Sequence, residues 1–239
     1  MTSAKTREKQ KQIKNLLVPV LEEHIWPLLQ TEGFSWRRSL RFLRGNPSVR
    51  QTLEFVIRTP RRRNRPVLAH ICPWITVRIP RIGEQTRKLL GEENVPGNPD
   101  IVLHQSAGRV GPDRTDTIWL FFSEEDLSDL GHCLAKYVKA YVLPFLNRYQ
   151  NPRDIVEGWE SGDERLAFPP DGWIQLAAAC LEIGRKEQAA KILWSKVWGK
   201  AELREKYRHA LDLLKIDPTR EQYELLPPFP EDPSEDDEP

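Results

Sequence analysis

The feature that most constrains the fold is a strand-forming run that passes directly into a long amphipathic helix. Residues 117–122 read Thr-Ile-Trp-Leu-Phe-Phe, and β-branched and aromatic side chains of this kind favour strands. Ser123 and the three acidic residues after it have the form of a helix N-cap with an acidic first turn. From Leu127 to Phe145 the apolar residues recur every three or four positions, which places them on one helical stripe. The segment therefore predicts a strand followed by a helix that packs on the sheet.

The N-terminal segment predicts a second long helix. Its apolar residues follow the same spacing from Ile13 to Leu29. Pro19 and Pro27 each remove a backbone donor, so we expect the helix to be kinked or broken there. Gly33 can adopt the left-handed conformation that ends a helix, and the residue after it, Phe34, is the expected apolar partner of the last turn.

Between these helices, apolar and polar residues alternate with a period of two, as they do in half-buried strands. The predicted strands are residues 39–44, 51–58, 67–72, 74–79, 101–104 and 117–122, with a short helix over residues 82–90. The expected fold class is α+β. We expect an antiparallel sheet of about five to six strands packed against the long N-terminal and closing helices, followed by a small all-helical C-terminal region.

A change of composition after residue 160 predicts a second part of the chain. We expect an α+β domain over residues 1–160, a linker at 161–172, a helical appendage at 173–226 and a Pro-rich, acidic, disordered tail at 227–239. The predicted helices of the appendage are residues 173–183, 186–198, 202–215 and 220–225. The pair at 173–198 resembles one tetratricopeptide unit, but a single repeat cannot build a binding groove. A small bundle is therefore the favoured interpretation, and peptide binding is the alternative.

The order of these elements resembles a known family. The resemblance rests on Gly33-Phe34, the strand that contains Trp74, the strand-to-helix passage at 121–127 and the helix ending at 142–146. Together they are similar to the DUF4304 family, a set of mostly bacterial domains of unassigned function, over about residues 8–160. The chain departs from that family in its arginine run at 61–65 and its added C-terminal helices. The family has no known active residues. The resemblance implies an α+β fold and an immunity or binding role, because genes beside bacterial toxin genes often encode small domains of this style.

The charges are segregated along the chain, and this predicts where a partner binds. Residues 1–90 hold 19 Lys and Arg against 6 Asp and Glu, whereas the last ten residues hold six acidic residues and no basic one. An arginine-rich loop lies between two predicted strands, with further arginines at 37, 38, 41 and 44. Guanidinium groups bind carboxylates and phosphates bidentately. The candidate partner-binding residues are Arg58, Arg61, Arg62, Arg63, Arg65, Trp74 and Arg78.

Three interpretations of this basic region stay open. The favoured one is a non-enzymatic binding protein with a protein partner, which we expect to be acidic, consistent with a toxin-immunity or partner-recruiting role. The first alternative is a nucleic-acid-binding protein, with Trp36 and Trp74 stacking on bases. The remaining alternative is that the arginines have a purely structural role, because arginines also protect an exposed sheet edge from aggregation.

The search for chemistry finds no strong constellation. His70 and Cys72 lie two residues apart on one predicted strand, which leaves an enzyme of unrecognised type as a second alternative. Neither that pair nor His132 with Cys133 supplies the four ligands of a zinc site. No glycine belongs to a phosphate-binding loop. We therefore expect no catalytic residues, no metal and no cofactor.

The cellular location follows from three negative features. No apolar run approaches the roughly 20 residues that cross a bilayer. The basic N-terminus lacks the apolar core of a secretory signal. Three cysteines without framework spacing favour a reducing compartment. We expect a cytoplasmic protein without membrane contact, whose oligomeric state the sequence leaves open.

Overall fold

The computed structural model describes residues 4–60, 67–91, 97–168 and 172–216, and these form two compact units. Unit 1 takes its residues from Met1–Arg78, Leu103–Gln150 and Glu164–Ala167, and unit 2 from Ile79–Val102, Asn151–Asp163 and Phe168–Pro239. The chain therefore passes between the units five times. This grouping differs from the expected division into a domain at 1–160, a linker at 161–172 and an appendage at 173–226, because an internal segment joins the helical unit.

Unit 1 contains a six-stranded sheet, which confirms the expected α+β fold class. The strands are β1 (Ser35–Trp36), β2 (Arg41–Gly45), β3 (Arg50–Arg58), β4 (Ala69–Arg78), β5 (Ile101–Ser106) and β6 (Trp119–Phe121). Their order is β1-β2-β3-β4-β5, and β6 pairs with β4 beside this path. The pairings of β1 with β2, β2 with β3, β3 with β4 and β4 with β6 are all antiparallel.

One strand prediction was wrong at its boundary. Residues 67–72 and 74–79 were expected to be separate strands, but β4 runs continuously through Pro73, which lies opposite Phe55 of β3. A proline cannot donate a hydrogen bond within a sheet, so its presence argues against a continuous central strand. Here nine consecutive residue pairs between β3 and β4 outweigh that single lost donor.

The N-terminal helix changes to a π-helical turn between its two prolines, whereas a kink or break was expected at each proline. It consists of α1 (Ala4–Val20), a π-helical turn η1 (Leu21–Ile25) and α2 (Trp26–Thr31), with Pro19 in the last turn of α1 and Pro27 in the first turn of α2. Gly33 has a φ of +78°. The Phe34 amide donates to the Leu29 carbonyl at 3.0 Å and the Gly33 amide to that of Gln30 at 3.1 Å. This is the Schellman ending that favours glycine at its left-handed position.

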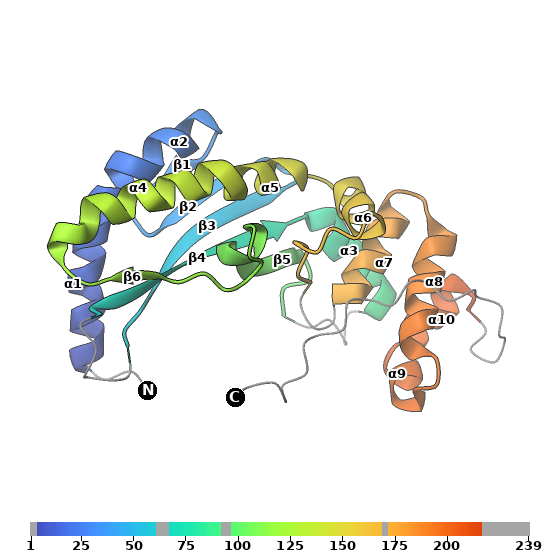
Figure 1. Cartoon of the computed structure of the whole chain (residues 1–239). Coiled ribbons are helices and arrows are strands. Elements are labelled where there is room, and N and C mark those ends of the chain that lie inside the picture. The colour runs from blue at the N-terminus through green and yellow to red at the C-terminus, as the bar shows by residue number, and fades with distance from the viewer. Residues whose placement is uncertain (1–3, 61–66, 92–96, 169–171, 217–239) are drawn as a thin grey trace. The chain divides into compact units, whose positions relative to one another are not determined.

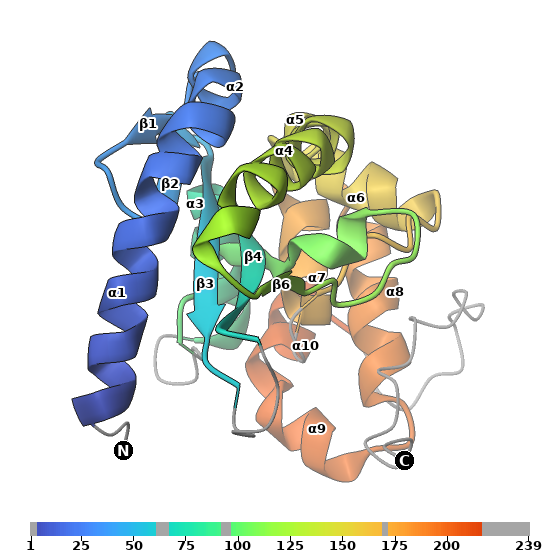
Figure 2. The same cartoon turned by 60° about the vertical axis from the view of Figure 1, so that its left-hand side comes forward.

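The closing helix is the other long rod of unit 1. It runs through the short 3₁₀ turn η4 (Glu124–Asp126), α4 (Leu127–Tyr137), the π-helical turn η5 (Val138–Val142) and α5 (Leu143–Arg148). At its start the Ser123 amide donates to the Asp126 carboxylate at 2.9 Å, which confirms the predicted capping interaction. Leu134, Val138 and Val142 are buried along its predicted stripe. Figure 1 shows α4 and α5 running along the sheet, and Figure 2 shows α1 beside β3.

A buried glutamine joins the closing helix to the sheet. Gln51 of β3 donates through Nε2 to the Leu146 carbonyl at 2.6 Å and to the Tyr149 carbonyl at 3.1 Å. Its Oε1 accepts from Nε of Arg44 on β2 at 2.8 Å. The last carbonyls of a helix have no partner within the helix, and Gln51 donates hydrogen bonds to two of them. It thereby fixes the end of α5 against the face of the sheet that carries the Gln51 side chain.

Unit 2 is helical and is built around one buried helix. Its helices are α3 (Pro80–Leu90), α6 (Pro152–Glu160), α7 (Gly172–Glu182), α8 (Lys186–Val197), α9 (Ala201–Lys206) and α10 (Arg208–Leu214). Nine consecutive residues of α7, from Gly172 to Cys180, are buried, because α3, α6 and α8 all pack against this helix. Gln175 on α7 donates to the carbonyls of Pro99 and Ile101 at 3.0 and 2.7 Å.

The expected helix pair at 173–198 corresponds to α7 and α8, joined at Gly184 with a φ of +79°. The single helix expected at 202–215 is two helices, because the backbone leaves helical geometry at Tyr207, whose ring packs edge-on against Trp173 at 4.5 Å. The helix expected at 220–225 and the tail at 227–239 lie outside the described residues.

The buried stripe of α4 generates a test of unit 1. Replacing Leu134 by Ala should lower the free energy of unfolding by about 2–5 kcal/mol, because Leu134 is fully buried and the substitution leaves a cavity. Replacing the exposed Lys136 on the same helix by Ala should change it by less than about 0.5 kcal/mol. Urea denaturation followed by circular dichroism measures both. Equal stabilities of the two variants would mean that α4 is not packed on the sheet.

Candidate functional site

The strand register gives the sheet of unit 1 two different faces. Phe42, Leu53 and Ile75 form one row across β2, β3 and β4, and all three are buried beneath the helices of unit 1. The alternate residues point to the other side, which we call the open face. Its members on β2, β3, β4 and β6 are Arg41, Leu43, Arg50, Thr52, Glu54, Val56, Arg58, His70, Cys72, Trp74, Thr76, Arg78 and Leu120.

Three of the predicted binding residues lie on this open face. Arg58, Trp74 and Arg78 have the same strand parity, whereas Arg61, Arg62, Arg63 and Arg65 lie outside the described residues. Arg58 pairs with His70 at one end of the β3–β4 ladder, and Arg78 lies at the other. The two ends are eight residues apart, or roughly 26 Å at about 3.3 Å per residue. The three residues therefore form a stripe with basic ends rather than one compact pocket.

Arg50 also lies on the open face, although it was not among the candidate residues predicted from the sequence. Arg50 lies directly opposite Arg78 in the antiparallel register. Directly paired residues have Cβ atoms about 4.5–5.5 Å apart, and like charges in such positions are destabilising. Among the described residues, neither guanidinium has a carboxylate partner. The alternation within β3 could have shown that Arg50 lies on the same face as Arg58. That Arg50 lies opposite Arg78 depends on the register between β3 and β4.

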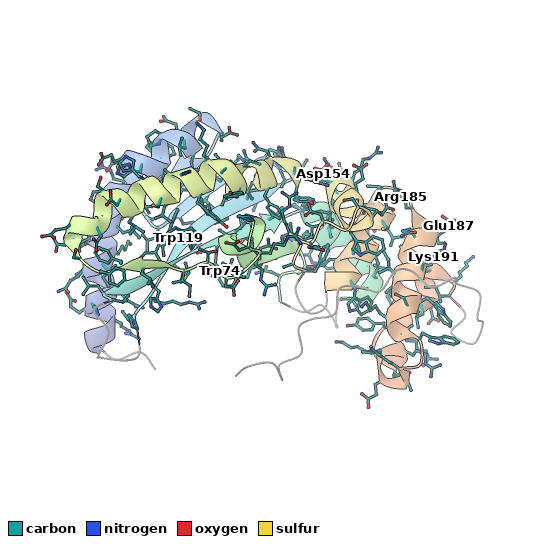
Figure 3. All side chains as sticks on the ribbon, viewed as in Figure 1. Trp74, Trp119, Asp154, Arg185, Glu187 and Lys191 are labelled. Carbon is teal, nitrogen blue, oxygen red and sulfur yellow. The ribbon has the colours of Figure 1, made fainter. Side chains whose placement is uncertain are left out.

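His104 of β5 is the second residue that was missed. Its Nδ1 lies 2.9 Å from Oγ1 of Thr76, and its ring lies 4.9 Å from the ring of Trp74. Thr76 and Trp74 belong to β4, so His104 joins the open face from a strand that is distant in sequence. No local pattern in residues 101–104 could have identified this contact. Figure 3 labels Trp74 of β4 on the open face and Trp119 of β6, which lies on the helix-covered face.

The arginines that flank the stripe do not join it. Arg38 pairs with Glu22, and Arg41 makes two hydrogen bonds with Glu54 at 2.8 and 3.0 Å. Arg44 points to the helix-covered face, where its guanidinium lies over the ring of Phe34 and 3.6 Å from Glu32. Burial lowers the pKa of Arg44, and the nearby Glu32 carboxylate partly offsets this.

Trp36, the other tryptophan considered for base stacking, is half-buried on the helix-covered side of the sheet. Its ring stacks on Phe42 at 5.2 Å and its Nε1 donates to the Ser39 carbonyl at 2.7 Å. Of the two tryptophans, Trp74 is therefore the one placed on the open face.

The Cys72 and His70 pair does not have the environment of a reactive thiol. Cys72 is buried, and that burial raises the pKa of its thiol, an effect that Arg58 opposes and Asp116 reinforces. Thiolate is the nucleophilic form, so a raised pKa lowers reactivity. Cys180 in unit 2 is also buried, which raises the pKa of its thiol to about 12. Within the described ranges, no three His, Cys, Asp or Glu side chains gather into a possible metal site.

Comparisons with family models, curated proteins and solved structures find no match. The resemblance to the DUF4304 family therefore stays a prediction. In the described part of the chain, no helix has the length and apolar character needed to span a bilayer.

The Arg50–Arg78 pair predicts a stabilising substitution. Replacing Arg50 by Glu converts a cross-strand repulsion into an attraction, so the free energy of unfolding should rise by roughly 0.5–1 kcal/mol. The same charge reversal at Lys139, an exposed helical position on unit 1, is the control and should give no gain. Urea denaturation at low ionic strength measures the difference. A variant no more stable than the parent would show that the two guanidiniums do not repel one another across the ladder.

The burial of two thiols predicts selective alkylation. With iodoacetamide at pH 8, the folded protein should be modified at the exposed Cys133 at least about tenfold faster than at Cys72 or Cys180, because burial and a raised pKa both suppress thiolate formation. Mass spectrometry of tryptic peptides reports each site, and unfolding in urea should equalise the rates. Rapid labelling of native Cys72 would instead support the enzyme alternative.

Proposed function

We propose that this chain is a non-enzymatic binding protein that recognises an acidic protein through the open face of its sheet. The observation that carries the proposal is the Arg50–Arg78 pair, in which two adjacent positive charges lack a carboxylate partner among the described residues. The arrangement costs stability, and such violations are typical of functional sites, where a ligand supplies the missing interaction. An acidic partner would supply it.

The rest of the face fits a protein partner. Trp74 is half-buried at its centre, and tryptophan and arginine are the residues that most often dominate binding energy at interfaces. Leu43 and Leu120 on the face are each 46% exposed. Ile118 and Phe122, which flank β6, are 42% and 41% exposed. Leu43 lies in the row next to Arg50 and Arg78, and Leu120 in the row of Arg58, so exposed apolar groups accompany the basic ends. This combination fits a partner whose acidic groups are flanked by apolar ones.

The nucleic-acid alternative has weaker support. A single-strand-binding surface combines a basic groove with several aromatic platforms. Of the two tryptophans considered, Trp36 stacks on Phe42 on the helix-covered side, and Trp74 already packs against His104. The arginines without a carboxylate partner lie at the two ends of the stripe, about 26 Å apart. Between them, the charge of Arg41 is neutralised by Glu54.

The resemblance to the DUF4304 family extends the proposal to a toxin-immunity role, in which the acidic partner is a toxin. The position of the gene tests this extension. A large polymorphic toxin gene beside it would support the immunity role, whereas its absence would leave only the general proposal of a partner-recruiting protein.

Binding of two model polyanions tests the main proposal. A fluorescein-labelled 20-residue poly-glutamate peptide should bind the full chain at 150 mM NaCl. The double variant Arg50→Gln/Arg78→Gln should bind it about tenfold more weakly, because each exposed charge contributes up to about 1 kcal/mol. Fluorescence anisotropy measures both dissociation constants.

The matched control removes two charges from the helix-covered side of unit 1. Lys136→Gln/Lys139→Gln should bind the peptide within twofold of the parent. A 20-nucleotide single-stranded DNA is titrated at the same ionic strength. If the DNA binds more tightly than the peptide and the arginine variant reduces the salt dependence of its binding, the nucleic-acid function replaces the one proposed here. Equal weakening by both double variants would show that only net charge matters.

A further inference from the structure

The end of the open face that contains Arg50 and Arg78 carries more than two charges. Thr52 is two residues from Arg50 on β3, and Thr76 is two residues from Arg78 on β4. The two threonines lie directly opposite each other on the open face. Residues two apart in a strand are about 6.6 Å apart, within the reach of an arginine side chain. His104 extends this group through its contact with Thr76. We call Arg50, Arg78, Thr52, Thr76 and His104 the donor cluster.

The Thr76–His104 contact leaves one hydrogen-bond donor free in either tautomer. If the Thr76 hydroxyl donates to Nδ1 of His104, the ring carries its hydrogen on Nε2. If Nδ1–H donates to Thr76, the hydroxyl hydrogen is free instead. His104 is exposed. The pair therefore offers a donor beside the two guanidiniums, whichever tautomer is present.

The nearest carboxylate does not neutralise the donor cluster. Glu54 is the next residue on this face beyond Thr52, but its two oxygens are held by Arg41 at 2.8 and 3.0 Å. In the described residues, no carboxylate is paired with Arg50 or Arg78. The cluster thus combines two positive charges with hydroxyl and imidazole groups and has no carboxylate of its own among the described residues.

We infer that the donor cluster binds a phosphate monoester, namely a phosphorylated serine or threonine of the protein partner. This inference rests on the proposed function and specifies the group that the partner presents. Arg50 and Arg78 occupy directly paired positions, so a single group neutralises both charges only if it is a dianion. A phosphate monoester carries a charge of about −1.5 to −2 at pH 7 and three acceptor oxygens, whereas a carboxylate carries one charge and two. Arginine forks match phosphate oxygens bidentately, and the hydroxyls and the imidazole can serve those that remain.

Three peptides with one variable position test the inference. A fluorescein-labelled dodecapeptide of Gly, Ala, Val and Thr carries phosphoserine at its centre, and its twins carry Glu or Ser there. With the full chain at 150 mM NaCl, the dissociation constant of the phosphopeptide should be about tenfold lower than that of the Glu twin, because the second charge and third oxygen find donors. The Ser twin should bind more weakly still.

Variants locate the effect. Arg78→Gln should remove most of the preference for phosphoserine over Glu, and Thr76→Val should reduce it by about threefold. Lys139→Gln, on the helix-covered side, should leave the preference unchanged. Circular dichroism of each variant shows that it is folded, so loss of preference reports the site and not the fold.

Every other outcome has a definite meaning. If phosphoserine and Glu peptides bind equally, the inference is wrong while the acidic-partner function stands. If phosphoserine is preferred but poly-glutamate does not bind, the donor cluster is a phosphate site and the broader proposal fails. If a 12-nucleotide single-stranded DNA binds as tightly as the phosphopeptide, the cluster recognises phosphodiesters and the inference is overturned. A preference that survives Arg78→Gln would also refute it.

Discussion

The antiparallel ladder between β3 and β4 is the constraint on which unit 1 depends. Its nine residue pairs decide which side chains face the helices and which face away. Because side chains alternate along a strand, a shift of β3 by one residue would expose Leu53 and Phe55 and bury Arg50. The burial of the apolar set therefore holds the arginines in their unfavourable pairing. Gln51 strengthens the same register, since its amide reaches the end of α5 only from the helix-covered face.

The open face shows how a fold can keep an arrangement that weakens it. The repulsion between Arg50 and Arg78 costs of the order of 1 kcal/mol or less, whereas burying one large apolar side chain contributes about 1.5–3 kcal/mol. The core of unit 1 can therefore offset the pair easily. Neighbouring arginines are treated differently: Arg38, Arg41 and Arg44 each lie beside a glutamate. Among the described residues, Arg50 and Arg78 have no such carboxylate, and neither has Arg58 at the other end of the stripe.

Local signals predicted the elements well where one physical rule acted alone. Glycine at 33 and serine at 123 marked a helix end and a helix start, because caps depend on residues within a few positions. Predictions of element boundaries were wrong where contacts with distant segments overrode a local preference. Pro73 suggested a break, but the ladder on both sides of it keeps β4 continuous. Tyr207 was expected inside one helix, yet its packing against Trp173 coincides with a break between α9 and α10.

The amino-acid sequence was enough to predict the α+β class, the two long helices and the alternation that separates the faces of each strand, because these follow from periodicity within a single segment. It also gave Trp74 and Arg78 the same parity within one strand, whereas the β3–β4 register placed Arg58 on their face. Only the tertiary structure decided that Arg50 faces Arg78, that His104 contacts Thr76, and that α3 belongs with the C-terminal helices. These are contacts between segments distant in sequence, and they depend on strand register and packing, which no local pattern encodes.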